Sequence, residues 1–240
     1  MNLITLLQAG QVQNSVAQAG KIVDEAIPQE KKLRVIDLIM NAGTGGIIII
    51  AILFIMLFVA LVIYFERLSA IKAAAKIDPN FMNQIRAFIK SGNIEGAKML
   101  AQQYDTAVGN LIEKGVSRIG KPLDDINKAI ENAGKLEVYK LEKNVSTLAT
   151  IAGAAPMIGF LGTVIGMILA FHNMASGGGK IEVSSLAQGI YTAMTTTVAG
   201  LIVGIIAYIA YNHLVVKTDK VVHQMEANAV EFLDLLNEPS

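Results

Sequence analysis

Three long stretches of this 240-residue chain contain no Asp, Glu, Lys or Arg. They run from Leu38 to Phe65, from Asn144 to Gly179 and from Val183 to Val216. A helix needs about 20 consecutive apolar residues to cross the hydrocarbon core of a bilayer, and each stretch exceeds that length. The pattern therefore predicts three transmembrane helices, over residues 45–66, 147–172 and 185–214.

The overall composition also favours a membrane protein. Hydrophobic residues make up 53% of the chain and charged residues 17%, whereas charged residues make up about 25% of an average soluble domain. The formal net charge of zero lacks the basic surplus of a nucleic-acid-binding surface, so we expect no nucleic-acid partner. With no cysteine and three scattered histidines, the sequence offers no ligand set for a metal, and we expect no cofactor.

Basic residues near the ends of the expected spans indicate the orientation, because cytoplasmic loops carry an excess of Lys and Arg. The segment between the first and second spans is rich in both, from Arg67 to Lys143. Only Lys180 lies between the second and third spans, whereas Lys217 and Lys220 follow the third. The first span alone is equivocal because basic residues also precede it, but the other two spans agree. The N-terminus is thus expected outside the cytoplasm and the C-terminus inside it.

This orientation assigns the polar segments to the two sides of the membrane. Residues 1–44 are expected to form a periplasmic N-terminal segment with an interfacial helix before the first span. The other polar segments are a cytoplasmic helical region at 67–146, a periplasmic hairpin at 173–184 and a cytoplasmic helical tail at 215–240.

The expected cytoplasmic segments have the apolar spacing of helices. Asp78-Pro-Asn starts one helix, and Ser91-Gly-Asn ends it and starts another over residues 94–104. A mixed-charge helix from about Leu123 is expected to continue directly into the second span, because no proline interrupts residues 131–144. The tail repeats the spacing of an amphipathic helix. The expected fold is an all-α integral membrane protein whose long helices extend into a cytoplasmic helical domain.

The second and third spans differ from the first in the size of their residues. Both are dense in small residues at four-residue spacing, which let helix backbones approach closely in a membrane, where lipid does not drive helices together. We expect these two helices to pack against protein and the bulky, β-branched first span to face lipid. The expected helix-packing residues are Gly159, Gly162, Gly166, Gly200, Gly204 and Pro156.

Threonine hydroxyls are notable polar groups within these two spans. Thr163 lies in the second span, and Thr192 and Thr196 lie four residues apart in the third, beside Thr195 and Thr197. Two interpretations stay open: each hydroxyl bonds to a carbonyl of its own helix, or the hydroxyls form a polar stripe that faces a pore or another helix. Threonine can relay a proton but cannot hold a charge at neutral pH.

No Asp, Glu, Lys or Arg lies in the body of any predicted span, and His172 and His213 lie near span ends. A proton pathway normally places an acid or a histidine inside the membrane. The chain therefore either conducts no ions or uses a carboxylate that a partner supplies.

The segment Leu148–Met167 contains the pattern Pro-x-x-Gly-x-x-Gly-Thr, from Pro156 to Thr163. Together with Gly189–Leu201 in the third span and Phe65–Leu68 at the end of the first, this segment resembles the MotA/TolQ/ExbB proton-channel family. Three spans and an outside N-terminus resemble its ExbB and TolQ branch, and ExbB most, rather than the four-span MotA branch.

This resemblance implies a motor subunit in the bacterial inner membrane, driven by the proton motive force, rather than an enzyme. It implies a homo-oligomeric ring, usually a pentamer, around the single spans of an ExbD-like or TolR-like partner that supplies an intramembrane aspartate. Force then passes through a TonB-like protein to outer-membrane transport, or through a TolA-like protein to envelope maintenance.

The resemblance also assigns expected roles to residues of this chain. Thr163 and Thr197 match pore-lining threonines, and Glu66 with Arg67 matches a charged pair at the cytoplasmic end of the first span. Thr192 occupies the position where many ExbB and TolQ proteins carry glutamate, which agrees with a proton carrier supplied by another chain. We expect Thr192 and Thr196 to belong to the same ion pathway.

Three alternatives stay open. The chain could serve a TolQ-like Tol-Pal motor, act as a structural membrane scaffold without ion conduction, or couple to sodium, which hydroxyls and carbonyls also coordinate. An intramembrane enzyme is disfavoured, because no serine pairs with a histidine at helical spacing. The glycines of the second span do not form a nucleotide-binding loop between a strand and a helix.

Overall fold

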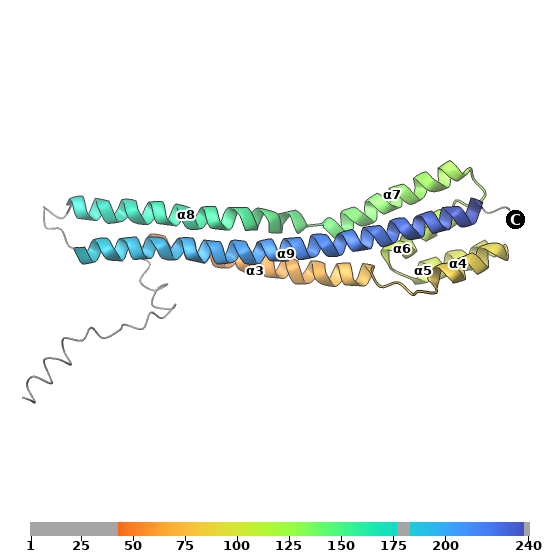
Figure 1. Ribbon diagram of the computed structural model, residues 1–240, viewed down its shortest axis with the longest axis horizontal. Coiled ribbons are helices and arrows are strands. Elements are labelled where there is room, and N and C mark those ends of the chain that lie inside the picture. Colours follow the sequence, from red (N-terminus) through yellow and green to blue (C-terminus); the bar gives the residue numbers. More distant parts are fainter. Residues whose placement is uncertain (1–42, 177–182, 238–240) are drawn as a thin grey trace, which may run out of the picture. The chain divides into compact units, whose positions relative to one another are not determined.

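The computed structural model describes residues 43–176 and 183–237, which all belong to one compact unit, Ile39–Ser240. Every regular element in these ranges is an α-helix (Figure 1). The helices are α3 (Gly43–Ala74), α4 (Phe81–Lys90), α5 (Ile94–Gln103), α6 (Ala107–Val116), α7 (Leu123–Glu142), α8 (Val145–Ser176) and α9 (Val183–Asn237).

Parts of three expected segments lie outside the described residues. These parts are residues 1–42, which include the expected interfacial helix, residues 177–182 of the expected hairpin and residues 238–240 of the expected tail. The hairpin's other residues belong to the end of α8 and the start of α9. Both helices are therefore longer than the predicted spans.

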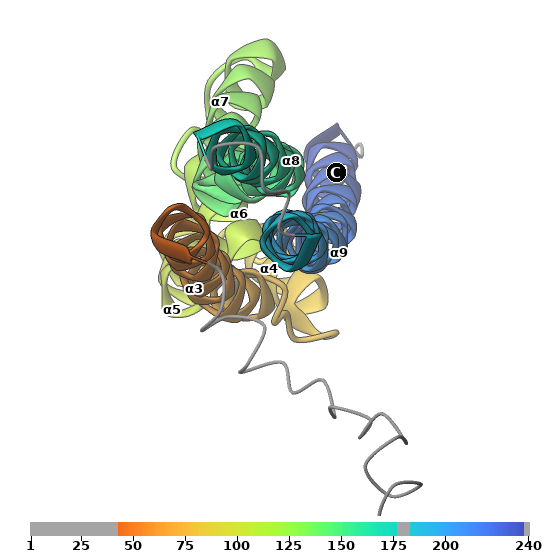
Figure 2. The ribbon, with the colours of Figure 1, turned by 90° about the vertical axis from the view of Figure 1, so that its left-hand side faces the viewer.

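Three helices, α3, α8 and α9, are long and apolar enough to cross a membrane, and each contains one predicted span. They lie side by side as a three-helix bundle (Figure 2). On α3, Leu53 and Ala60 are buried in the bundle, whereas Phe58 is 67% exposed. Met157 of α8 and Ile209 of α9 are exposed to a similar degree. Lipid or another chain must therefore cover an outer face of all three helices, not of α3 alone.

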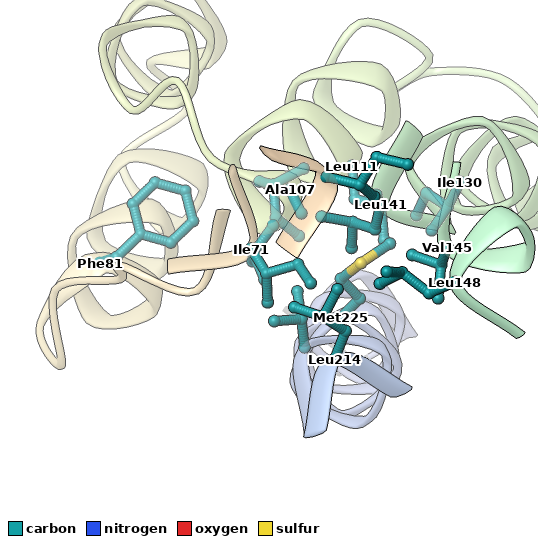
Figure 3. Close-up of a cluster of buried hydrophobic side chains, with 14 of the residues drawn as sticks. Ile71, Phe81, Ala107, Leu111, Ile130, Leu141, Val145, Leu148, Leu214 and Met225 are labelled. Atoms are coloured by element: carbon teal, nitrogen blue, oxygen red, sulfur yellow. The ribbon is translucent and has the colours of Figure 1, made fainter. Parts of the chain in front are cut away.

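α9 is a single helix of 55 residues that extends far beyond the predicted third span. Its second half contacts α4, α6 and α7, and α5 contacts α4 and α6. We call residues 75–142 together with 217–237 the charged helical region. Figure 3 shows the apolar core that this region shares with the bundle, where Met225 and Leu214 of α9 lie near Leu141 of α7 and Leu148 of α8. The spans and the charged helical region are thus packed around one core.

Side-chain caps define where the short helices begin. Asn93 Oδ1 accepts a hydrogen bond from Gly96 N at 2.9 Å at the start of α5, and Thr106 Oγ1 accepts one from Gly109 N at 3.1 Å at the start of α6. α4 and α5 lie where the sequence predicts them, and the turn between them contains Gly92 with a φ of +73°, which glycine adopts freely. α6 was not predicted, although Thr106 is a favourable residue for a helix start.

The expectation of one continuous helix from Leu123 into the second span is wrong. α7 ends at Glu142 and α8 begins at Val145, and Asn144 between them has a φ of +62°. Asparagine adopts this left-handed conformation more readily than other non-glycine residues, because its short side chain can bond to the local backbone. No proline marks this break, so the absence of proline from residues 131–144 does not predict a continuous helix.

The break at Asn144 predicts an unusual order of stability for substitutions there. Asn144→Ala is expected to cost about 1 kcal/mol, because a Cβ without the asparagine amide is strained in the left-handed region. Asn144→Gly, the matched control, should unfold at the parent temperature or above it, since glycine carries no such strain. Thermal unfolding of the purified protein in detergent, followed by circular dichroism, measures both. Equal losses for the two variants would contradict the assignment.

Candidate functional site

α8 and α9 touch backbone to backbone in the middle of the bundle. A methyl group built on Gly200 would lie 2.6 Å from the carbonyl oxygen of Ala155 and 2.9 Å from Cα of Gly159. A methyl group on Gly159 would lie 2.7 Å from the carbonyl oxygen of Thr196. Side chains at these two positions would force the helices apart, so both glycines are required by the close approach.

The other expected packing residues continue the same contact, which we call the α8–α9 interface. Gly204 faces the ring of Pro156, at 2.6 Å from a built methyl group to Cγ, and Gly166 faces Ala193. Gly162 faces the Thr196 side chain, whose Oγ1 would lie 2.4 Å from a methyl group. The interface therefore runs over several turns of both helices.

Two threonine hydroxyls of α9 converge on one carbonyl of α8. Thr196 Oγ1 lies 3.1 Å from the carbonyl oxygen of Gly159, and Thr197 Oγ1 lies 3.2 Å from the same atom. Thr196 Oγ1 also lies 2.7 Å from the carbonyl oxygen of Ala193 in its own helix. Because glycine at 159 leaves its carbonyl uncovered, these hydroxyls can reach across the interface. The contact joins the expected packing residues to the expected polar residues.

The threonines expected to share a pathway differ in their exposure. Thr196 is only 1% exposed and lies inside the α8–α9 interface, where its hydroxyl faces another helix. Gly162 of α8 has no side chain, and this leaves room for the Thr196 side chain. Thr163, Thr192 and Thr197 are partly exposed. Thr163 Oγ1 donates to the carbonyl oxygen of Phe160 at 2.7 Å, within its own helix.

Arg67 is almost fully buried at the end of the first span, and Glu66 beside it is half exposed. The Arg67 guanidinium forms an ion pair with Glu66, and its Nη1 donates to the carbonyl oxygen of Lys140 at 3.3 Å. Lys140 lies in the last turn of α7, where carbonyls have no partner further along the helix and a cation is favourable. Arg67 thus connects α3, about two turns before its end, to the last turn of α7.

Two polar contacts near this boundary could not be found from the sequence. Tyr64 Oη of α3 lies 2.9 Å from His213 Nδ1 of α9. Glu137 of α7 is buried and accepts hydrogen bonds from Asn110 of α6 at 3.1 Å and from Lys140 Nζ at 2.7 Å. The first pair is separated by 149 residues, and the bond from Asn110 to Glu137 involves a helix that was not predicted. Only the Glu137–Lys140 pair, three residues apart on α7, follows from helical spacing.

The α8–α9 interface offers oxygen atoms but no charged side chain. Residues 145–176 and 183–216 contain no Asp, Glu, Lys or Arg. Hydroxyls and carbonyls can pass a proton along but cannot store one as a charge at neutral pH. Within residues 43–176 and 183–237, no group of three His, Asp or Glu residues could hold a metal ion. A charged group at this interface is therefore not supplied by these two stretches.

Comparisons with known proteins cover most of these elements. Residues 103–227, just over half of the chain, match the sequence model of the MotA/TolQ/ExbB proton channel family. This segment contains α6, α7, α8 and most of α9, including both sides of the α8–α9 interface.

Similar proteins include both ExbB and TolQ proteins. The chain is 25% identical over 162 residues to a putative biopolymer transport protein ExbB homolog of Methanothermobacter thermautotrophicus, covering 67% of this chain and 57% of the relative. It is 39% identical over 79 residues to the biopolymer transport protein ExbB of Helicobacter pylori, covering 33% of this chain and 54% of the relative. The chain thus spans little more than half the length of these two relatives.

A third relative is matched over more of its length. The chain is 24% identical over 187 residues to the Tol-Pal system protein TolQ of Pseudomonas aeruginosa, covering 73% of this chain and 80% of the relative. The matches therefore fall on ExbB and TolQ proteins alike.

The close approach of α8 and α9 predicts opposite outcomes for two glycines in the spans. Gly200→Ala is expected to destabilise the protein by about 1–3 kcal/mol, because the methyl group collides with the α8 backbone. Gly153→Ala is the matched control, since a methyl group there would meet no atom within 4 Å. Thermal unfolding in the same detergent measures both variants. A Gly200→Ala protein as stable as the Gly153→Ala protein would contradict the observed interface.

Proposed function

The chain belongs to the MotA/TolQ/ExbB proton channel family, and from this premise we propose that it is an ExbB-like subunit of an ion-driven motor. The family and the three apolar helices make it a multi-pass membrane protein. In the proposal it lies in the bacterial inner membrane with the N-terminus in the periplasm and the C-terminus in the cytoplasm. The charged helical region then projects into the cytoplasm.

The proposed complex is a homo-oligomeric ring, with five copies as the expected number, around single-span ExbD-like partners. Each partner contributes an aspartate to the interior of the ring, and proton entry down the gradient drives relative motion of ring and partner. A TonB-like protein passes the force to transport across the outer membrane. The chain itself acts as a channel and motor part, not as an enzyme.

The observation that carries this proposal is the absence of Asp, Glu, Lys and Arg from the long stretches of α8 and α9 that also hold the threonines. A membrane proton pathway needs a group that can take up and release a proton. We propose that the partner's carboxylate is this group and that Thr163, Thr192 and Thr197 present hydroxyls to it. The partial exposure of all three side chains in the single chain supports this role.

The rigid parts of the subunit have a place in this mechanism. Because α8 and α9 touch through Gly159 and Gly200, they can hold the hydroxyls at fixed positions while the partner moves. We propose that Arg67, paired with Glu66, keeps α3 attached to the last turn of α7, where Arg67 donates to the carbonyl oxygen of Lys140. A torque on the spans would then be resisted by the charged helical region.

Two other functions are favoured by particular observations. A TolQ-like role in a Tol-Pal motor is supported by the match that covers 80% of a TolQ protein. A purely structural scaffold is supported by the local bond of Thr163 to Phe160, which needs no ion. Deletion of the gene distinguishes the ExbB-like motor from the TolQ-like motor. Loss of energised outer-membrane import would favour the ExbB-like role, and loss of envelope integrity would favour the TolQ-like role.

The motor proposal predicts that the Thr163 hydroxyl is needed for energy transduction. Thr163→Val keeps the shape of the side chain and removes the hydroxyl, so partner-dependent activity in cells is expected to fall at least about tenfold, the effect of losing roughly 1.4 kcal/mol at a limiting step. Thr163→Ser should retain activity. Expression and ring assembly are measured in parallel by native gel electrophoresis.

Thr150→Val is the matched control on the same helix. Thr150 Oγ1 also bonds locally, to the carbonyl oxygen of Ser146 at 3.1 Å, but it lies outside the proposed pathway. Full activity of an assembled Thr163→Val protein would favour the scaffold function instead. Equal losses for Thr150→Val and Thr163→Val would indicate a general effect of removing a hydroxyl from α8.

A further inference from the structure

A polar groove of about 560 Å³ lies where the α7–α8 break meets α9. One charge-free stretch begins at Asn144, directly before α8, and another ends at Val216 of α9. The groove therefore lies at the edge of the apolar bundle. Tyr139 and Tyr211 contribute to its lining, and tyrosine is enriched at the boundary between lipid and water. Its position makes the groove accessible to a lipid headgroup.

The charges in the lining are divided between the two signs. Glu142 and Asp219 contribute carboxylates, and Lys143 contributes an ammonium group. The first amides of α8 have no partner within the helix, and Val145 and Ser146, which begin it, also line the groove. Lys143, these amides and the Ser146 hydroxyl suit a phosphate, whereas the two carboxylates suit a cation.

A buried hydroxyl in the wall of the groove also lacks a partner. Thr218 is 4% exposed, and its Oγ1 makes no hydrogen bond to any described residue. A buried hydroxyl without a partner costs free energy. Thr218 lines the groove beside Asp219, so the wall of the groove contains a polar atom that no described residue satisfies.

The surface beside the groove can accept an acyl chain. Gly153 lies two helical turns beyond Ser146 on the same side of α8, and a methyl group there would meet no atom within 4 Å. On α9, Ile205 and Tyr208 continue the spacing of Tyr211 and Val215, and both are exposed. An open apolar strip therefore leads from the groove along the bundle.

From these observations we propose that the groove binds a phospholipid with a primary ammonium headgroup, as in phosphatidylethanolamine. Its phosphate binds at the start of α8 with Lys143, its ammonium group binds between Glu142 and Asp219, and an acyl chain lies along Gly153. An anionic lipid would place a phosphate beside two carboxylates without supplying the cation that they favour. A choline lipid supplies a cation that cannot donate hydrogen bonds to them.

Native mass spectrometry of the delipidated full chain, in the oligomeric state in which it is purified, tests this site. Phosphatidylethanolamine, phosphatidylcholine and phosphatidylglycerol with identical acyl chains are added in equal amounts. We expect phosphatidylethanolamine to bind about tenfold more tightly than either of the others, which is the effect of roughly one charge-assisted hydrogen bond. Equal binding of the three lipids would overturn the proposal.

Variants show whether the preference comes from the groove. In the double variant Glu142→Gln with Asp219→Asn, the affinity for phosphatidylethanolamine should fall to the affinity for phosphatidylcholine. Lys143→Gln should weaken the binding of all three lipids. Asp234→Asn, an exposed acid further along α9, is the matched control and should change nothing. An unchanged preference in the double variant would overturn the site.

A second copy of the chain in the groove would also overturn the proposal. It would appear as cross-links between copies when a photoreactive amino acid replaces Tyr139, which lines the groove. The binding measurement uses the chain without its motor partners, so a negative result here leaves the proposed motor function untouched.

Discussion

The direct backbone contact between Gly159 of α8 and Gly200 of α9 is the interaction on which the arrangement of the spans depends. Lipid does not push helices together, so close packing of small residues supplies the attraction between two apolar helices. The same contact exposes the Gly159 carbonyl to the hydroxyls of Thr196 and Thr197. The helix contact and the two hydroxyl–carbonyl contacts therefore depend on the same residue. A larger residue at 159 would disrupt all of them.

Much of this fold is predictable from the sequence because the membrane imposes a simple rule. Charge-free stretches locate α3, α8 and α9, and the four-residue spacing of glycines identifies the faces that meet. The break at Asn144 was missed because asparagine is a weak breaker. The helix α6 was missed although it is as long as α4 and α5, which were predicted, and although Thr106 caps its start. The burial of Thr196 was also missed: spacing placed it beside Thr192, but only the three-dimensional structure shows that it faces Gly162. Contacts across 149 residues, such as Tyr64 with His213, follow from the tertiary fold alone.

The charged residues lie outside the spans, but the helices that carry them are packed against the spans. Arg67, buried where the first span ends within α3, donates to the last turn of α7. The core around Met225 continues from the bundle into the charged helical region. A displacement of the spans would therefore be transmitted to that region through packed contacts. In the proposed motor, this subunit would serve as a stiff frame, and the group that changes charge would belong to the moving partner.

Proton flux through the reconstituted chain tests this division of roles most directly. The chain is placed in liposomes under a pH gradient, alone or with its single-span partner, and flux is followed with a pH-sensitive dye. The account predicts no flux for the chain alone and flux with the partner, which an Asp→Asn change in the partner's span abolishes. Flux through the chain alone, at the rate of the complex, would contradict it, because the spans would then carry protons without a carboxylate.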